Sequence, residues 1–136
     1  MRVFFDTNVI LAAFLAEGAC KTLFRHVTDG TITGVVSEQV LDEVTRNLKK
    51  LVKIAPERRS AVLETIRLSF EVVPTPATAP RLSRDEDDDT ILAAARASAD
   101  LLVTGDKDLL TIARSRAKFE IVRPAELLLR IAAAAD

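Results

Sequence analysis

The chain has 136 residues, of which 49% are hydrophobic and 29% are charged, and this composition is that of one globular domain rather than a disordered or fibrous protein. Its formal net charge of -1 argues against a protein that holds nucleic acid through overall positive charge. No apolar run approaches the roughly 20 residues that a membrane-spanning helix needs. Because Asp6 interrupts the N-terminal apolar stretch before a signal peptide could form, we expect no membrane location and a cytoplasmic protein.

Short apolar segments alternate with helical patterns along the chain. The predicted strands are residues 2–5, 32–36, 71–73, 101–103 and 119–122. The predicted helices cover residues 9–15, 21–26 and 38–51, a stretch that starts at Pro56, a stretch that starts near Asp87, a stretch with Leu109, Leu110 and Ile112, and residues 124–133. This alternation predicts a single α/β domain over residues 1–136, in which helices cover both faces of a mostly parallel five-stranded sheet.

Two aspartates occupy equivalent places in this pattern. Asp6 and Asp106 each follow a predicted strand and precede a helix, so both are expected at the carboxyl edge of the sheet, where α/β proteins bind ligands. An aspartate at such a junction often caps the helix by accepting backbone N–H bonds. For either residue alone, capping is the simpler interpretation.

The acidic run at residues 85–89 contains a carboxylate that faces the core. If the helix begins near Asp87, Asp88 shares a face with Ile91, Leu92 and Ala95, whereas Asp89 projects away. Buried carboxylates are rare unless they are paired or bind a metal. A favourable interaction with the helix dipole explains acids in a first turn, but not one on the apolar face.

The helix over residues 38–51, capped by Ser37, supplies three more acids. Asp42 points away from the apolar stripe and is expected in solvent. Glu38 and Glu43 flank the stripe at similar angles, so helical geometry does not choose between them.

Converging carboxylates favour a bound cation, because without one they raise each other's pKa values. Oxygen ligands select hard ions such as Mg²⁺ or Mn²⁺, which suit hydrolysis of a phosphodiester. His26 is the only histidine, so any Ser-His or Cys-His nucleophilic system would have to use it. Cys20 is the only cysteine, which excludes an internal disulfide and a metal cluster held by thiolates.

A basic stretch lies between residues 46 and 67, where seven basic side chains face two acidic ones. Arg46, Lys49, Lys50 and Lys53 begin it. Such a run is equally well explained as a solvated face or as a surface that follows a phosphate backbone.

Four motifs in order resemble those of PIN domains. They are Phe5-Asp6-Thr7-Asn8-Val9, the helix with Glu43, Asp87-Asp88-Asp89 before Ile91-Leu92-Ala93, and Val103-Thr104-Gly105-Asp106-Lys107-Asp108. The likeness is greatest to the small prokaryotic VapC-like group, which belongs to toxin–antitoxin systems.

The resemblance implies an α/β/α sandwich and a ribonuclease that uses Mg²⁺ or Mn²⁺ to cleave single-stranded RNA. It also implies a cognate antitoxin, and surplus apolar helical surface suggests a homodimer. The implied metal-binding and catalytic residues are Asp6, Glu43, Asp88 and Asp106, with Asp108 as a further ligand and Asn8 and Thr104 as supporting residues. If the protein binds RNA, the basic stretch supplies the candidate RNA contacts Arg46, Lys49, Lys50 and Lys53.

Two other interpretations fit part of the pattern. One is a PIN-like module that binds but does not catalyse, and the other is a receiver-like domain that accepts a phosphoryl group on an aspartate. The receiver interpretation requires a lysine after the fifth strand, where this chain has Arg123-Pro124. We therefore rank the nuclease first and the silent module second.

Overall fold

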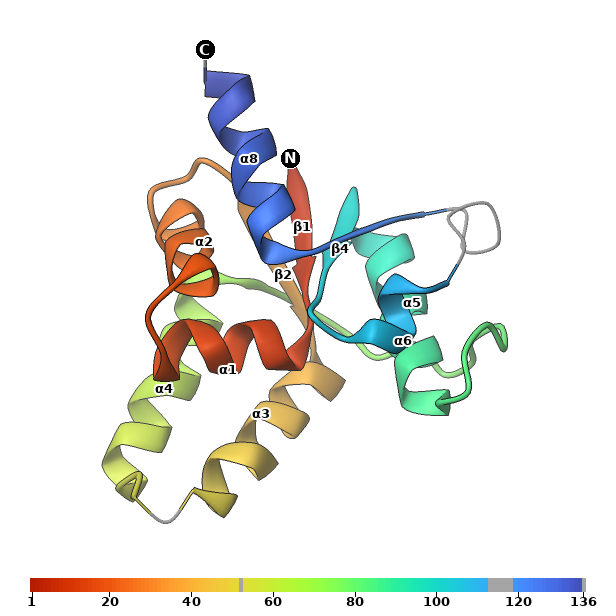
Figure 1. Cartoon of the computed structure of the whole chain (residues 1–136). Helices are drawn as coiled ribbons and strands as arrows, with labels where there is room; N and C mark the ends of the chain where they lie inside the picture. Colours follow the sequence, from red (N-terminus) through yellow and green to blue (C-terminus); the bar gives the residue numbers. More distant parts are fainter. Residues whose placement is uncertain (52, 113–118, 136) are drawn as a thin grey trace.

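The protein, described by a computed structural model over residues 1–51, 53–112 and 119–135, is built on one five-stranded sheet (Figure 1). Its strand order is β3-β2-β1-β4-β5, and every neighbouring pair is parallel. The strands are β1 (Arg2–Phe5), β2 (Thr33–Ser37), β3 (Glu71–Val73), β4 (Leu101–Val103) and β5 (Glu120–Val122). The sequence-based prediction of a parallel α/β sheet is confirmed.

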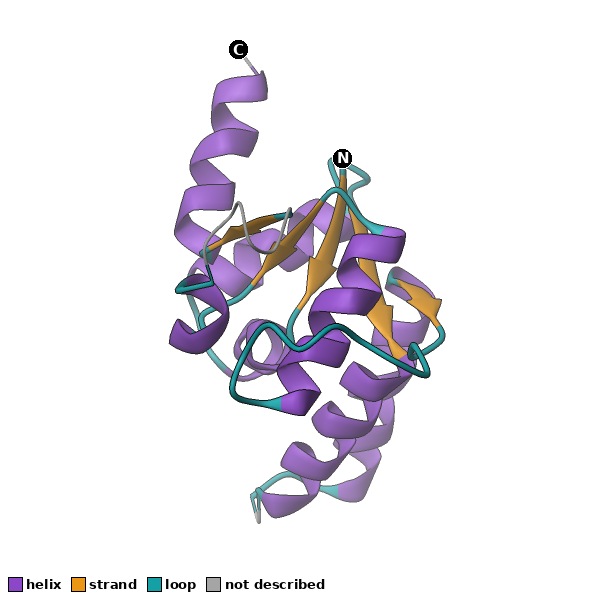
Figure 2. Cartoon of the chain, turned by 90° about the vertical axis from the view of Figure 1, so that its right-hand side faces the viewer, coloured by secondary structure: helices purple, strands orange, loops and turns teal. Residues whose placement is uncertain are grey.

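Helices cover both faces of this sheet. Their bounds are α1 (Thr7–Leu15), α2 (Ala19–Thr28), α3 (Glu38–Lys50), α4 (Pro56–Ser69), α5 (Glu86–Ser98), α6 (Lys107–Leu110) and α8 (Pro124–Ala135). Helix α2 packs against α1 and α8 on one side, while α5 packs on β1, β2 and β4 from the other, which completes a three-layer sandwich (Figures 1 and 2). Within the described residues no single helix could span a membrane; α1 and α2 qualify by length and composition only as a pair, bent by 94°.

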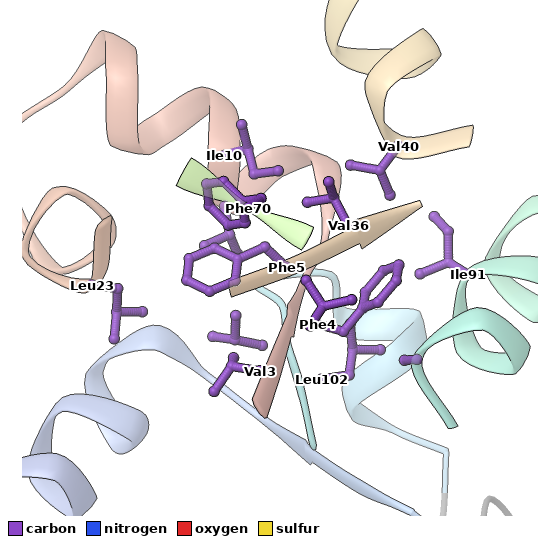
Figure 3. Packing of buried hydrophobic residues seen from close by; sticks show 14 of the residues in the cluster. Val3, Phe4, Phe5, Ile10, Leu23, Val36, Val40, Phe70, Ile91 and Leu102 are labelled. Carbon is purple, nitrogen blue, oxygen red and sulfur yellow. The ribbon is translucent and has the colours of Figure 1, made fainter. Parts of the chain in front are cut away.

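Strand β1 lies at the centre of the core. Val3, Phe4 and Phe5 are each 0% exposed, because successive side chains of a strand point to opposite faces and both faces are covered. Phe4 points toward Ile91 of α5, whereas Phe5 points to the opposite side, where its ring meets that of Phe70 edge-on at 5.0 Å (Figure 3). Apolar packing on both faces therefore fixes the position at which β1 ends.

The direction in which successive strands are added to the sheet changes at β1, between β1 and β4. The chain passes from β1 to β2 on one side, and β4 lies on the other side of β1, with Phe5 in register with Val103. In parallel sheets a crevice opens at such a switch point, outside the carboxyl ends of the strands. Asp6 follows β1 directly, and its N–H donates to the Val103 carbonyl at 3.1 Å. The predicted common edge for Asp6 and Asp106 is confirmed.

Several predicted element boundaries differ from the observed ones. Strand β2 ends at Ser37, one residue later than predicted, and α2 extends the predicted 21–26 segment at both ends. Helix α6 is a single turn that ends before Ile112. Ser37 caps α3 as predicted, because its hydroxyl accepts from the Val40 N–H at 3.3 Å. Residues 113–118, between the sixth predicted helix and β5, lie outside the described residues.

Candidate metal centre

Asp6 is buried at the crevice, with 5% of its surface exposed. One carboxylate oxygen accepts from the Thr7 N–H at 2.8 Å, so the residue does cap α1. The other oxygen accepts from the Thr104 hydroxyl at 2.6 Å. Burial raises the pKa of Asp6, the two hydrogen bonds oppose this shift, and the charge of Asp106 adds to it. Asp6 is therefore both a cap and a member of an acidic site.

Thr104 connects Asp6 to the second aspartate of the predicted set. Thr104 is 0% exposed. Its hydroxyl donates a hydrogen bond to Asp6 and accepts one from the Asp106 N–H at 2.9 Å. Asp106 in turn caps α6 by accepting from the Asp108 N–H at 2.8 Å. The buried hydroxyl thus fixes the loop after β4 relative to the end of β1, consistent with the predicted supporting role of Thr104.

Asp88 approaches this loop from α5. Carboxylate oxygens of Asp88, Asp106 and Asp108 lie within 4.8 Å of one another. Asp88 is 8% exposed, as its place on the apolar face predicted, and no described residue donates a hydrogen bond to its carboxylate. The pKa of Asp88 is raised from 3.8 to about 7, first by burial and then by the negative charge of Asp106 and other nearby aspartates. We call Asp6, Asp88, Asp106 and Asp108 the acidic cluster.

Glu43 joins the same region from α3. It is half-buried, and its carboxylate accepts a hydrogen bond from the Thr7 hydroxyl. Burial raises the pKa of Glu43, the hydrogen bond from Thr7 lowers it, and the negative charge of Asp6 raises it further. Glu38 is exposed and lies 3.4 Å from the Arg67 guanidinium. The structure therefore brings Glu43, not Glu38, toward the acidic cluster.

Thr7 is a functional candidate that sequence analysis missed. It is 6% exposed, and its backbone and side chain contact two different acids, Asp6 and Glu43. Asn8, the predicted supporting residue, is exposed and hydrogen-bonds no described side chain. The signal that would have favoured Thr7 is its place in the first turn after Asp6, where a hydroxyl can face the next helix.

The prediction that Asp89 projects away from the protein is wrong. Asp89 is 2% exposed and accepts from the N–H groups of Leu82 at 3.1 Å and Ser83 at 2.7 Å. The helical wheel treats α5 in isolation, whereas the preceding loop folds over this side of the helix. Asp89 binds that loop, and Asp88 alone of the two turns toward the acidic cluster.

Most of the predicted RNA contacts lie away from the acidic cluster. Arg46, Lys49, Lys50 and Lys53, which we call the basic set, are all exposed. Helix α3 runs away from the sheet edge, so its last turn lies far from α5 and α6 (Figure 1). At 1.5 Å per residue, Lys50 is about 10 Å further along the helix than Glu43. Lys49, Lys50 and Lys53 therefore lie away from the crevice, whereas Arg46 is one turn beyond Glu43 on α3.

The acidic cluster has the chemistry of a divalent-cation site. Its side-chain donors are all carboxylate oxygens, which hard ions such as Mg²⁺ and Mn²⁺ prefer. No described residue donates a hydrogen bond to Asp88, and burial and then the charge of neighbouring aspartates raise its pKa, so a cation would relieve the repulsion at Asp88. The residues therefore fit a metal ion.

Comparison with known proteins identifies the family. The sequence model described as the PIN domain matches residues 2–108. The chain belongs to the PIN domain family. The strand order also differs from the 2-1-3-4-5 order of receiver domains, which removes the receiver-like interpretation.

Individual relatives of this PIN domain are distant in sequence. A protein of Methanocaldococcus jannaschii, uncharacterized protein MJ1680, is 28% identical over 118 residues, which cover 82% of this chain and 75% of that protein. The crystal structure of VapBC2 from Rickettsia felis bound to a DNA fragment from their promoter matches with a TM-score of 0.65 and 16% identity, covering 90% of this chain and 98% of that one. The PIN domain endonuclease Utp24 matches with a TM-score of 0.52 and 22% identity, covering 90% and 84%. These similarities show the PIN fold.

Proposed function

We propose that this PIN domain is a metal-dependent ribonuclease that hydrolyses phosphodiester bonds of single-stranded RNA. The observation that carries the proposal is the convergence of Asp6, Asp88 and Asp106 at the switch point. No described residue donates a hydrogen bond to the Asp88 carboxylate, and its pKa is raised to about 7. Membership of the PIN family and the similarity to an endonuclease support nuclease activity at the level of the family. The presence of several acids around one crevice favours this activity over a catalytically silent module.

In this proposal Asp6, Glu43, Asp88 and Asp106 hold Mg²⁺ or Mn²⁺, and Asp108 is a further ligand at the rim. An ion held there would lower the pKa of a bound water and offset the negative charge that develops on the leaving oxygen of a phosphodiester. The hydroxyls of Thr104 and Thr7 hold the carboxylates of Asp6 and Glu43 in fixed orientations. Such outer hydrogen bonds keep the ligands in place before the cation binds.

RNA recognition in this proposal rests on phosphate contacts. The chain has no tryptophan and no tyrosine, so base stacking on those side chains is not available. The basic set of Arg46, Lys49, Lys50 and Lys53 offers positive charge to RNA that extends beyond the acidic cluster. Its contribution should depend strongly on salt concentration.

We also propose that the protein acts in the cytoplasm as the toxin of a toxin–antitoxin pair, with a cognate antitoxin protein and a homodimeric state. The support is its resemblance to small VapC-like PIN proteins and its structural similarity to VapBC2. Coexpression with the product of a neighbouring short reading frame, followed by size-exclusion chromatography, tests the pairing.

The nuclease proposal is tested with purified protein and a fluorescently labelled single-stranded RNA. Cleavage should require Mn²⁺ or Mg²⁺, stop on addition of EDTA, and fall at least about 100-fold in Asp6→Asn. Asp42→Asn is the matched control, because Asp42 is exposed on α3. Cleavage that survives EDTA, or undiminished cleavage by Asp6→Asn, contradicts the proposal.

A further inference from the structure

The loop before α5 is held in place by a buried carboxylate. Asp89 accepts from the N–H groups of Leu82 and Ser83, and the Ser83 hydroxyl donates to the Asp85 carbonyl at 2.7 Å. A carboxylate is seldom buried without such partners, because an uncompensated charge is costly in a low dielectric. These hydrogen bonds therefore fix the backbone on both sides of residue 84.

That residue is Arg84, and its side chain reaches the acidic cluster. Its guanidinium donates to Asp108 at 2.8 Å, joining the loop before α5 to helix α6. Among the described residues this is the ion pair that reaches the acidic cluster. The Arg84 side chain is 86% exposed and that of Asp108 is 46% exposed. The pair thus lies at the rim of the candidate metal centre, open to a ligand.

Arg81, in the same loop, provides a contrast. It lies 3.4 Å from the buried Asp89, whose side chain is 1% exposed, and so is engaged on the other side of the loop. The basic set lies along the second half of α3 and just beyond its end. Among the described residues Arg84 is therefore the basic side chain that forms an ion pair with the acidic cluster.

Resting on the proposed nuclease function, we propose that Arg84 binds the RNA phosphate next to the metal centre. The carboxylates of the acidic cluster repel an RNA phosphate, and a positive charge at their rim offsets that repulsion. The planar guanidinium matches two phosphate oxygens at once. Because an exposed ion pair is weak, Arg84 can exchange Asp108 for phosphate at little cost.

The test compares wild type, Arg84→Ala, Arg84→Lys and the control Arg96→Ala, in which an exposed arginine at the last turn of α5 is removed. Fluorescence anisotropy in Mn²⁺ at low temperature gives the Kd for labelled single-stranded RNA as a function of salt, and cleavage assays give KM and kcat. Arg84→Ala should raise Kd and KM about 10-fold or more, with kcat much less affected. It should also reduce the slope of log K against log salt by about 0.7.

Arg84→Lys should fall between wild type and Arg84→Ala, and Arg96→Ala should match wild type. The Mn²⁺-induced rise in Tm should persist in every variant, which separates phosphate binding from damage to the metal site. Unchanged RNA affinity in Arg84→Ala, with or without tighter Mn²⁺ binding, overturns the proposal, because Arg84 then only neutralises Asp108. If the wild-type protein binds RNA without cleaving it, the nuclease proposal is refuted, but the binding comparison still tests the role of Arg84. If the wild-type protein binds no RNA, both proposals are refuted.

Discussion

Replacing Asp88 by asparagine should stabilise the metal-free protein at pH 8 and greatly reduce its response to a divalent cation. Asp88 lies 8% exposed against Asp106, and its pKa is raised to about 7 by burial and then by that neighbour. Because the folded-state pKa exceeds the ordinary value of 3.8, the native protein binds this proton more tightly than the unfolded chain does. The associated stability is complete below about pH 4 and is lost as the pH rises to about 7.

The size of the effect follows from that difference. About three pKa units correspond to roughly 4 kcal/mol. The Asp88 oxygens are not fully enclosed, so solvent screening reduces this to about 1–2 kcal/mol. For a domain of 136 residues that is a rise in Tm of about 3–8 °C. Asparagine keeps the shape of the side chain and removes the charge.

Thermal unfolding is best followed by circular dichroism, because the protein has no tryptophan or tyrosine to report unfolding by fluorescence. The gain in Tm of Asp88→Asn over wild type should shrink from pH 8 to pH 4.5. Mn²⁺ at about ten times its Kd should add about 1.4 kcal/mol to wild type and much less to the variant. The control Asp42→Asn should match wild type. A variant less stable than wild type at pH 8, or an equal Mn²⁺ response in both, refutes the reasoning.

Three further substitutions test other parts of the structure. Gly34→Ala should destabilise the fold by about 1–3 kcal/mol, because an added Cβ would lie 2.6 Å from the buried Phe70 ring; an unchanged urea midpoint would contradict this packing. Thr104→Val removes the hydroxyl while keeping the volume and should reduce RNA cleavage about 10- to 100-fold, whereas Thr104→Ser should retain most activity; full activity of the valine variant would show that the hydroxyl orients nothing. Lys49→Glu combined with Lys50→Glu should weaken RNA binding and reduce its salt slope by about 1.4; unchanged affinity at low salt would make these lysines an ordinary solvated surface.

The sheet was predictable because its information is local. Val3, Phe4 and Phe5 form a continuous apolar run, which is typical of a parallel strand buried on both faces, and all three are 0% exposed. Strand order was not predictable, because it depends on which strands pair across the whole chain. The placement of Asp6 and Asp106 at one edge needed only the strand directions, and it is confirmed.

The acidic residues show where local periodicity stops being informative. The helical wheel placed Asp88 correctly against the core, because its neighbours on that face are apolar. It failed for Asp89, whose environment is a loop that the wheel does not contain. It also left Glu38 and Glu43 undecided, since the distinction arises from a contact between Glu43 and the Thr7 hydroxyl of another helix.

A crystal grown with Mn²⁺ and analysed by anomalous diffraction tests the central claim most directly. We predict a manganese peak held by carboxylate oxygens of Asp6, Glu43, Asp88 and Asp106, at the switch point between β1 and β4. A peak bound only by acids elsewhere on the surface, or no peak at Mn²⁺ concentrations that support cleavage, would contradict a metal-dependent nuclease built on these carboxylates.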